Sequence, residues 1–175
     1  MGFSRGGQSA LYSAMNRLYA TLGPANKLRF AAHVAFYPDC TTTYRDDSDV
    51  SDKPIRILHG TPDNYNPVAP CRAYVERLTS AHKDVKLIEF PDAYHVFDAP
   101  SLRTPLTLKG AATTRHCQLV EADDHQIVNH ETQKPFSYAD ACVEKDPMLA
   151  YNEAASNQAH LIVRDFLTEI FQLKP

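Results

Sequence analysis

Segments with helical spacing alternate along this chain with short apolar runs, and this alternation strongly limits the folds available to it. The helical segments are Gln8 to Leu22, one starting near Asn66-Pro67 and one starting near Asp146-Pro147. The apolar runs are Phe30 to Tyr37, Ile55 to His59 and Val85 to Phe90. Such alternation is typical of α/β proteins with a mostly parallel sheet. We therefore predict three parallel strands with flanking helices.

The segment 102–145 breaks this alternation. Cys117 to Val120 and Gln126 to Val128 are apolar stretches separated by Asp123-Asp124, which predicts a small β-hairpin inside a longer irregular excursion. Excursions of this length usually serve as functional lids or surface decorations. We expect a single α/β domain over residues 1–175, with the excursion inside it, and a polar loop from Asp39 to Asp52.

Charge and hydropathy exclude two classes of partner. The net charge of −3 gives no basic excess that would favour nucleic acid or an anionic membrane surface. No apolar run approaches the roughly 20 residues that span a bilayer. Met1-Gly2-Phe3 leads directly into a helical pattern, so we expect no signal peptide in this chain.

The stretch Gly2-Phe3-Ser4-Arg5-Gly6 matches the pattern G-x-S-x-G. Small residues on either side of the serine let backbones pass closely, so the serine can occupy a strained turn between a strand and a helix. The helix that follows would direct its positive end at a developing oxyanion, with the backbone N–H of Arg5 as one donor. We predict that Ser4 is a nucleophile; the alternative is the glycine-rich start of an ordinary helix.

An acid and a base follow the next two strands. Asp63 comes after Leu58-His59-Gly60, and His95 comes after the strand ending at Phe90. The carboxyl ends of parallel strands meet at one edge of a sheet, where Ser4 would also stand. The order Ser, Asp, His also matches that of this fold. We predict a catalytic triad of Ser4, Asp63 and His95, with Asp39 as the alternative acid.

The other histidines that we considered are not assigned to the triad. Those outside the excursion are interpreted as strand or surface residues: His33, His59 and His82. Those inside it leave a metal site open as an alternative: His116, His125 and His130. We expect no metal and no cofactor.

The four cysteines predict two disulfides. Cys117 and Cys142 bracket the hairpin, so a bridge between them would close the excursion at its base. Cys40 and Cys71 follow adjacent strands, which lie about 4.8 Å apart, so a second bridge is sterically reasonable. The alternative is four buried free thiols in a cytosolic protein. If the cysteines are paired, a periplasmic or secreted location is favoured for the parent protein.

Several motifs together resemble the dienelactone hydrolase family of the α/β-hydrolase superfamily. They are Gly2-Phe3-Ser4-Arg5-Gly6-Gly7, Phe36-Tyr37-Pro38-Asp39-Cys40, Gly60-Thr61-Pro62-Asp63-Asn64-Tyr65 and Tyr94-His95-Val96-Phe97-Asp98. The resemblance covers Gly2 to about Pro100 and the last helix. It implies hydrolysis of small-molecule ester or lactone bonds, although the best-known members of the family use a cysteine where Ser4 stands here.

The resemblance also implies that this chain corresponds to the C-terminal half of the fold. A full member has several strands before the elbow, which also carry the second oxyanion donor, so we expect a product truncated before the nucleophile elbow. The alternative function is a catalytically inactive fragment or binding module that retains the triad residues.

Truncation would leave the strand from Phe30 to Tyr37 at the edge of the sheet. That strand is apolar on both faces and has no charged residue before Pro38. Unpaired backbone groups beside apolar side chains favour pairing with another chain. We therefore expect self-association through this edge and little esterase activity from the isolated chain.

Overall fold

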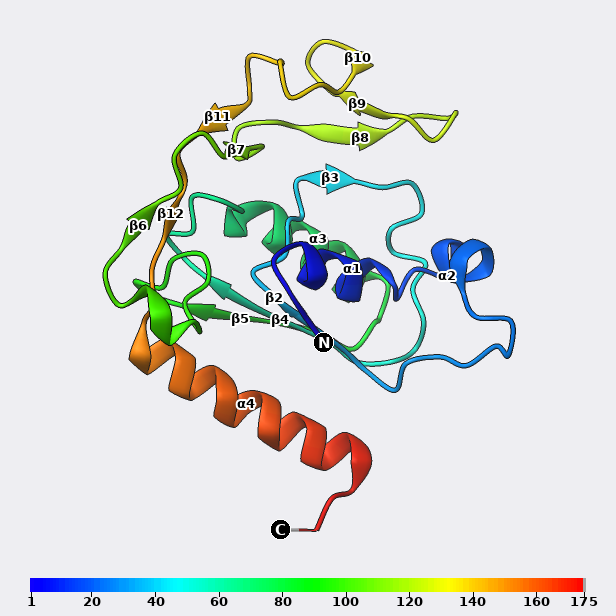
Figure 1. Cartoon of the computed structure of the whole chain (residues 1–175). Helices are drawn as coiled ribbons and strands as arrows, with labels where there is room; N and C mark the ends of the chain where they lie inside the picture. The colour runs from blue at the N-terminus through cyan, green and yellow to red at the C-terminus, as the bar shows by residue number, and fades with distance from the viewer. Residues whose placement is uncertain (175) are drawn as a thin grey trace.

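A parallel sheet of four strands forms the centre of the structure, a computed structural model that describes residues 1–174 (Figure 1). The strand order is β1-β2-β4-β5. The strands are β1 (Gly2–Phe3), β2 (His33–Phe36), β4 (Ile55–Gly60) and β5 (Val85–Phe90). Three of them are the predicted strands, and β1 adds a fourth because Gly2 and Phe3 pair with Ala35 and Phe36.

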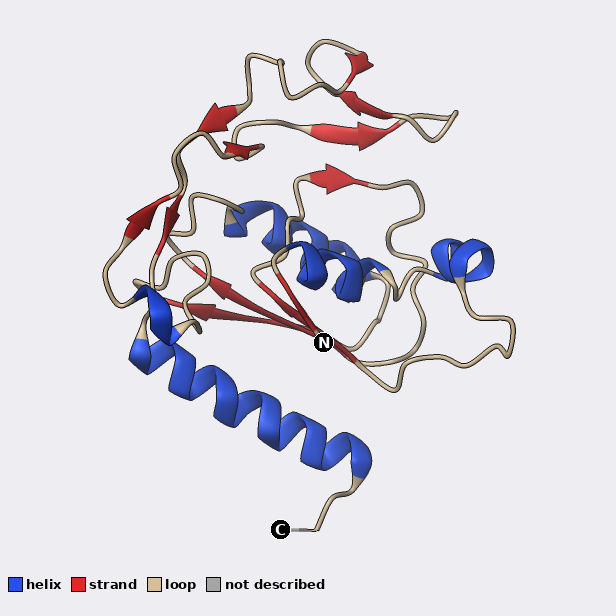
Figure 2. Cartoon of the chain, viewed as in Figure 1, coloured by secondary structure: helices blue, strands red, loops and turns tan. Residues whose placement is uncertain are grey.

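Helices cover both faces of this sheet (Figure 2). The helices are α1 (Arg5–Tyr12), α2 (Asn16–Leu22), α3 (Val68–Ser80) and α4 (Glu153–Phe171). Successive strand residues point to opposite faces. Ala35 and Ile57 therefore pack with the apolar residues of α1 and α3, whereas Phe36 and Leu58 pack with those of α4. The result is a three-layer arrangement whose strands all end at the same edge.

A second sheet, of order β10-β9-β8-β3, lies above α1 and α3 in the view of Figure 1. Its strands are β3 (Thr42–Thr43), β8 (Leu119–Glu121), β9 (Ile127–Asn129) and β10 (Lys134–Pro135). The predicted hairpin is confirmed, because β8 and β9 pair antiparallel. The expectation that 39–52 is entirely loop is wrong, since Thr42 and Thr43 pair with Leu119 and Val120.

Short paired strands connect the excursion to the main sheet. They are β6 (Leu106–Thr107) with β12 (Met148–Leu149), and β7 (Ala112–Thr113) with β11 (Glu144–Lys145). A 3₁₀ turn, η1, spans Pro100–Leu102. The last helix therefore begins at Glu153 and not near Asp146, and the Asn152 side chain caps it by accepting from the Ala155 N–H at 3.0 Å.

The predicted helix from Gln8 to Leu22 is broken in two. Met15 forms an antiparallel bridge with Val50, and the Ser51 N–H donates to the Ala14 carbonyl at 2.8 Å. Ala14 and Met15 are fully buried by these contacts. Their backbone pairs with a distant segment, so it does not continue the helix.

Two other boundaries differ from the predictions. The strand expected over Phe30 to Tyr37 is limited to His33–Phe36, and Phe30 is exposed. The helix expected to be capped by Asn66 begins at Val68, with Pro67 in the capping position. Asn66 does not cap the helix; its side-chain amide instead donates to the Tyr37 carbonyl at 2.9 Å.

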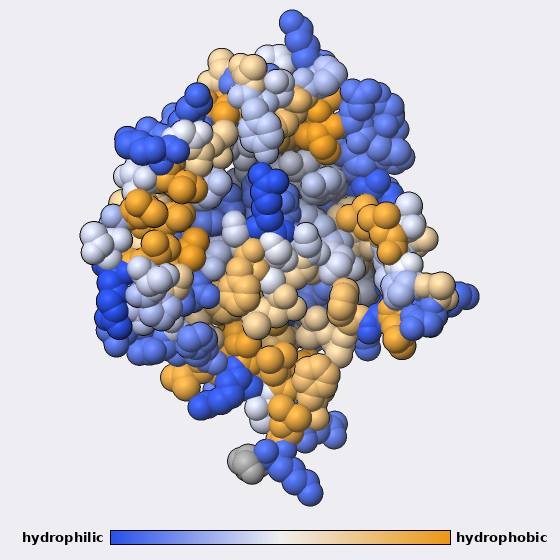
Figure 3. Space-filling view, in the orientation of Figure 1, coloured by the Kyte–Doolittle hydropathy of each residue, from blue (hydrophilic) through white to orange (hydrophobic). Residues whose placement is uncertain are grey.

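The edge strands of the main sheet are β1 and β5, so the expectation that the strand after Phe30 forms an edge is wrong. Phe3 in β1 is 42% exposed. Exposed apolar side chains also occur along α4, and Figure 3 shows hydrophobic surface near the C-terminal end of that helix. Within residues 1–174, no helix is long and apolar enough to cross a membrane.

Candidate active site

Ser4 occupies a strained turn between β1 and α1. Its φ of 52° and ψ of −119° are unusual for a residue with a side chain. A Cβ added to Gly2 would lie 1.9 Å from the Gly6 carbonyl oxygen, and one added to Gly7 would lie 2.5 Å from the Phe36 oxygen. A Cβ at Gly6 would meet nothing. The tight turn therefore requires Gly2 and Gly7, whereas the second glycine of the motif tolerates a side chain.

The three predicted triad residues meet at the carboxyl edge of the main sheet. The Ser4 Oγ lies 2.9 Å from the His95 Nε2, and the His95 Nδ1 lies 2.8 Å from the Asp63 Oδ2. Both His95 and Asp63 are buried. A hydroxyl, an imidazole and a carboxylate joined in this order can activate the hydroxyl as a nucleophile.

Asp63 is held by its own loop. Its Oδ1 accepts from the backbone N–H groups of Tyr65 at 2.8 Å and Asn66 at 2.9 Å, which leaves Oδ2 for His95. Asp39, the alternative acid, has different partners: its oxygens accept from the Thr41 N–H at 2.8 Å and the Thr114 hydroxyl at 3.3 Å. The structure therefore brings Asp63, and not Asp39, to His95.

Two tyrosine rings flank His95, and sequence reasoning gave them no role. The rings of Tyr37 and Tyr65 lie 4.7 Å and 4.8 Å from the imidazole ring. The Tyr37 hydroxyl donates to Asp98 at 2.6 Å, and burial, together with that hydrogen bond, raises the tyrosine pKa. Both residues occur in the motifs shared with the family, which is the signal that could have identified them.

His59 lies fully buried on β4, close to the proposed acid. Burial lowers its pKa, and this outweighs the opposing effect of the Asp63 charge. Among the described residues its Nε2 has no hydrogen-bond partner. The neutral ring therefore fills space behind the site without adding a charge to it.

A cavity of about 220 Å³ opens beside Ser4. Ser4, Arg5 and Asn66 line it from the main sheet side, and Ile127 and Phe136 line it from the second sheet. The backbone N–H of Arg5 begins α1, so the positive end of the helix dipole points toward this space. Within residues 1–174 that N–H has no protein acceptor, which leaves it available to a bound oxygen.

The other predicted residues lie elsewhere. His33 is buried on β2 with its Nδ1 2.9 Å from the Ala10 carbonyl, and His82 is exposed after α3. His116 and His125 lie beside Glu144 and Glu121, at 3.2 Å and 2.9 Å, and His130 is exposed. In the described part of the chain no three His, Cys, Asp or Glu residues are grouped to hold a metal ion.

The structure joins the cysteines in the two predicted pairs. Cys40 and Cys71 have an S–S distance of 2.04 Å, and Cys117 and Cys142 have one of 2.07 Å. The first bridge ties the loop after β2 to α3, and the second closes the excursion. Both therefore reinforce the segments around the cavity.

Comparisons with known proteins give a consistent result. A family model described as the dienelactone hydrolase family matches residues 1–171. A search of curated protein sequences finds no significant match. Among solved structures, MGS-M1, an α/β-hydrolase enzyme from a Medee basin deep-sea metagenome library, is 18% identical with a TM-score of 0.52, and the match covers 98% of this chain and 53% of that one.

A second solved structure is P91, described as a dienelactone hydrolase-like promiscuous phosphotriesterase from metagenomic libraries. It is 15% identical with a TM-score of 0.55, and the match covers 97% of this chain and 50% of P91. At these identities the likeness shows the fold, and it confirms the predicted α/β-hydrolase architecture. This chain spans about half the length of these two proteins.

Proposed function

The chain belongs to the dienelactone hydrolase family, and on that premise we propose that it hydrolyses carboxylic ester or lactone bonds with Ser4 as the nucleophile. The resemblance predicted from the motifs is confirmed by the family match. The observation that carries the proposal is the hydrogen-bonded series from Ser4 through His95 to Asp63.

The proposed reaction proceeds through an acyl-enzyme. The Ser4 Oγ attacks the carbonyl carbon while the His95 Nε2 takes the hydroxyl proton, and Asp63 holds the imidazole in the required tautomer. His95 then gives this proton to the leaving oxygen. Water, activated by His95, releases the acid and restores Ser4. No metal or cofactor enters these steps.

The negative charge of the tetrahedral intermediate needs donors near Ser4. The N–H of Arg5 and the N-terminal dipole of α1 supply one such position. The strained φ of Ser4 supports this assignment, because such strain persists where surrounding structure enforces it, often at sites of chemistry.

The disulfides support a proposal about location. Disulfides persist in oxidising compartments and are rare in the cytosol. With both pairs formed, we propose that the protein acts in the periplasm or outside the cell.

Hydrolysis of p-nitrophenyl acetate tests the function. Ser4→Ala and His95→Ala should each lower turnover by several orders of magnitude, as loss of a triad member does elsewhere. Asp63→Asn should cost far more than Asp39→Asn, which is the matched control for the acid. Turnover that survives Ser4→Ala would contradict the proposal. A chain with no turnover at all would favour the alternative of a non-catalytic binding module.

A further inference from the structure

We infer that the second sheet forms a rigid wall of the substrate pocket and restricts the enzyme to esters whose group on that side is short. This rests on the proposed ester hydrolysis and names the substrate class for the same site. The residues assigned to set the length are Ile127 and Phe136, with Leu119 behind them.

One face of the second sheet is aligned toward Ser4. Leu119 pairs with Asn129 and Glu121 pairs with Ile127, so the side chains of Leu119 and Ile127 lie on the same face. The N–H of Phe136 donates to the Ile127 carbonyl at 2.8 Å, which places Phe136 beside Ile127. These three apolar residues line the same cavity as Ser4.

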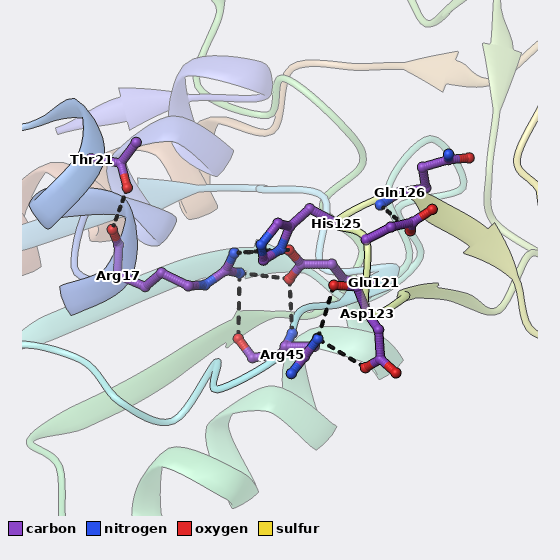
Figure 4. Close-up of polar contacts among 8 residues, drawn as sticks. Arg17, Thr21, Arg45, Glu121, Asp123, His125 and Gln126 are labelled. Carbon is purple, nitrogen blue, oxygen red and sulfur yellow. Dashed lines mark hydrogen bonds and ion pairs between the residues drawn. The ribbon is translucent and has the colours of Figure 1, made fainter.

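The wall is fixed at its far end by a buried ion pair, drawn in Figure 4. The Glu121 side chain is only 4% exposed, and its Oε2 accepts from the Arg17 Nη2 at 2.6 Å and from the Arg45 N–H at 3.0 Å. Moving the hairpin away would separate a buried carboxylate from its partners, which is strongly unfavourable.

One covalent bridge inside the excursion and one polar contact to the loop after β2 add to this support near the site. The Cys117–Cys142 bridge begins two residues before β8 and closes the excursion. The Thr114 hydroxyl donates to Asp39 at 3.3 Å, which ties the excursion to the loop after β2. The bridge therefore makes the excursion a closed unit, and polar links to Arg17, Arg45 and Asp39 hold that unit against the main sheet, so the cavity cannot enlarge readily for a longer substrate.

The size of the cavity gives the substrate class. Its volume of about 220 Å³ lies below the roughly 300–1,000 Å³ of pockets for drug-sized ligands. A short alkyl group fits between the apolar side chains, and each methylene that fits should raise kcat/KM about four-fold. Once the chain meets Phe136, further methylenes should lower kcat/KM.

The test measures kcat/KM over two series: p-nitrophenyl esters from acetate to octanoate, which lengthen the acyl group, and acetates of lengthening alcohols. In the series whose lengthening group enters the cavity, kcat/KM of the native chain should fall about ten-fold or more as that group grows from four to eight carbons. Phe136→Ala should reduce that loss to a few-fold by opening the wall. Leu106→Ala, an exposed change in the same excursion outside the cavity, should leave the profile unaltered.

Several outcomes would overturn the inference. If kcat/KM of the native chain does not change with chain length in either series, the inference is wrong, and no variant is needed to show it. If Phe136→Ala leaves the dependence of kcat/KM on chain length unchanged, the inference is wrong although the proposed hydrolysis stands. If circular dichroism shows that Phe136→Ala does not fold, Ile127→Ala provides the same test. Absence of any Ser4-dependent hydrolysis would instead refute the proposed function, and this inference with it.

Discussion

Replacement of Gly60 by alanine should disturb the proposed site through a single methyl group. Gly60 ends β4, and its Cα faces the loop between β5 and His95. A Cβ at this position would lie 1.8 Å from the Ala93 carbonyl oxygen, whereas real Cβ atoms stay beyond 3.0 Å. One of the two backbones must therefore move by at least 1.2 Å. That movement separates the loops carrying Asp63 and His95.

The size of the effect follows from this displacement. Overpacking a rigid interior costs about 1–3 kcal/mol of stability. A shift of about 1 Å in catalytic geometry can cost roughly 10²-fold in rate. We therefore expect Gly60→Ala to lower the free energy of unfolding by about 1–3 kcal/mol and kcat/KM for p-nitrophenyl acetate by about 10²-fold.

Gly6→Ala is the matched control, because its added Cβ meets no atom within 4 Å. Alanine is favoured over glycine in helices by up to about 1 kcal/mol, so this variant should be neutral or slightly more stable. Urea unfolding gives the stabilities, and the ester assay gives the rates. Equal stability of Gly60→Ala and Gly6→Ala would refute the reasoning, whatever the activity of the chain.

Three further predictions concern the parts that surround the site. Burial alone would raise the pKa of Glu121, but hydrogen bonds, led by the one from Arg17, hold that pKa below its usual value. The ion pair therefore stabilises the fold fully above the unfolded pKa of about 4.3. This stabilisation is lost as the pH falls through the lower pKa of the folded state. Glu121→Gln should lower stability at neutral pH by about 1–3 kcal/mol and reduce the further loss on acidification, and an unchanged acid profile in thermal melts would contradict this. Replacing both Cys40 and Cys71 by alanine should destabilise the fold by about 3.7 kcal/mol, the chain-entropy value for a separation of 31 residues, whereas an unaltered urea midpoint would show that the bridge contributes little. Finally, the exposed β1 edge with Phe3 should make the chain self-associate, and light scattering after size-exclusion chromatography would exclude this if it showed a monomer at every concentration.

Local patterns were sufficient to predict three of the four strands of the central sheet and the residues of the candidate triad. The apolar runs at β2 and β4 are typical of strands buried in a parallel sheet, and β5 extends that sheet at its edge. Once those strands are parallel, their carboxyl ends share an edge, so the residues that follow them come together. This is why Ser4, Asp63 and His95 could be identified from spacing and residue type.

Tertiary contacts decided what local patterns could not. Met15 leaves the helical path because its backbone pairs with Val50, and Thr42 becomes a strand because Leu119 lies beside it. The local sequence does not indicate these partners, because Met15 and Val50 are 35 residues apart and Thr42 and Leu119 are 77 residues apart.

Whether a feature of this protein could be predicted from its sequence depends on how far apart in the chain the interacting residues lie. The sequence by itself determined β2, β4 and β5, the strained turn at Ser4 and the order of the acid and base, because these depend on hydrophobic period and turn chemistry within a few residues. Only the tertiary structure decided that Tyr37 and Tyr65 flank His95 and that Phe136 faces Ser4 across a small cavity. The first relation depends on how the loops after β2, β4 and β5 pack together, and the second depends on how the second sheet packs against the first.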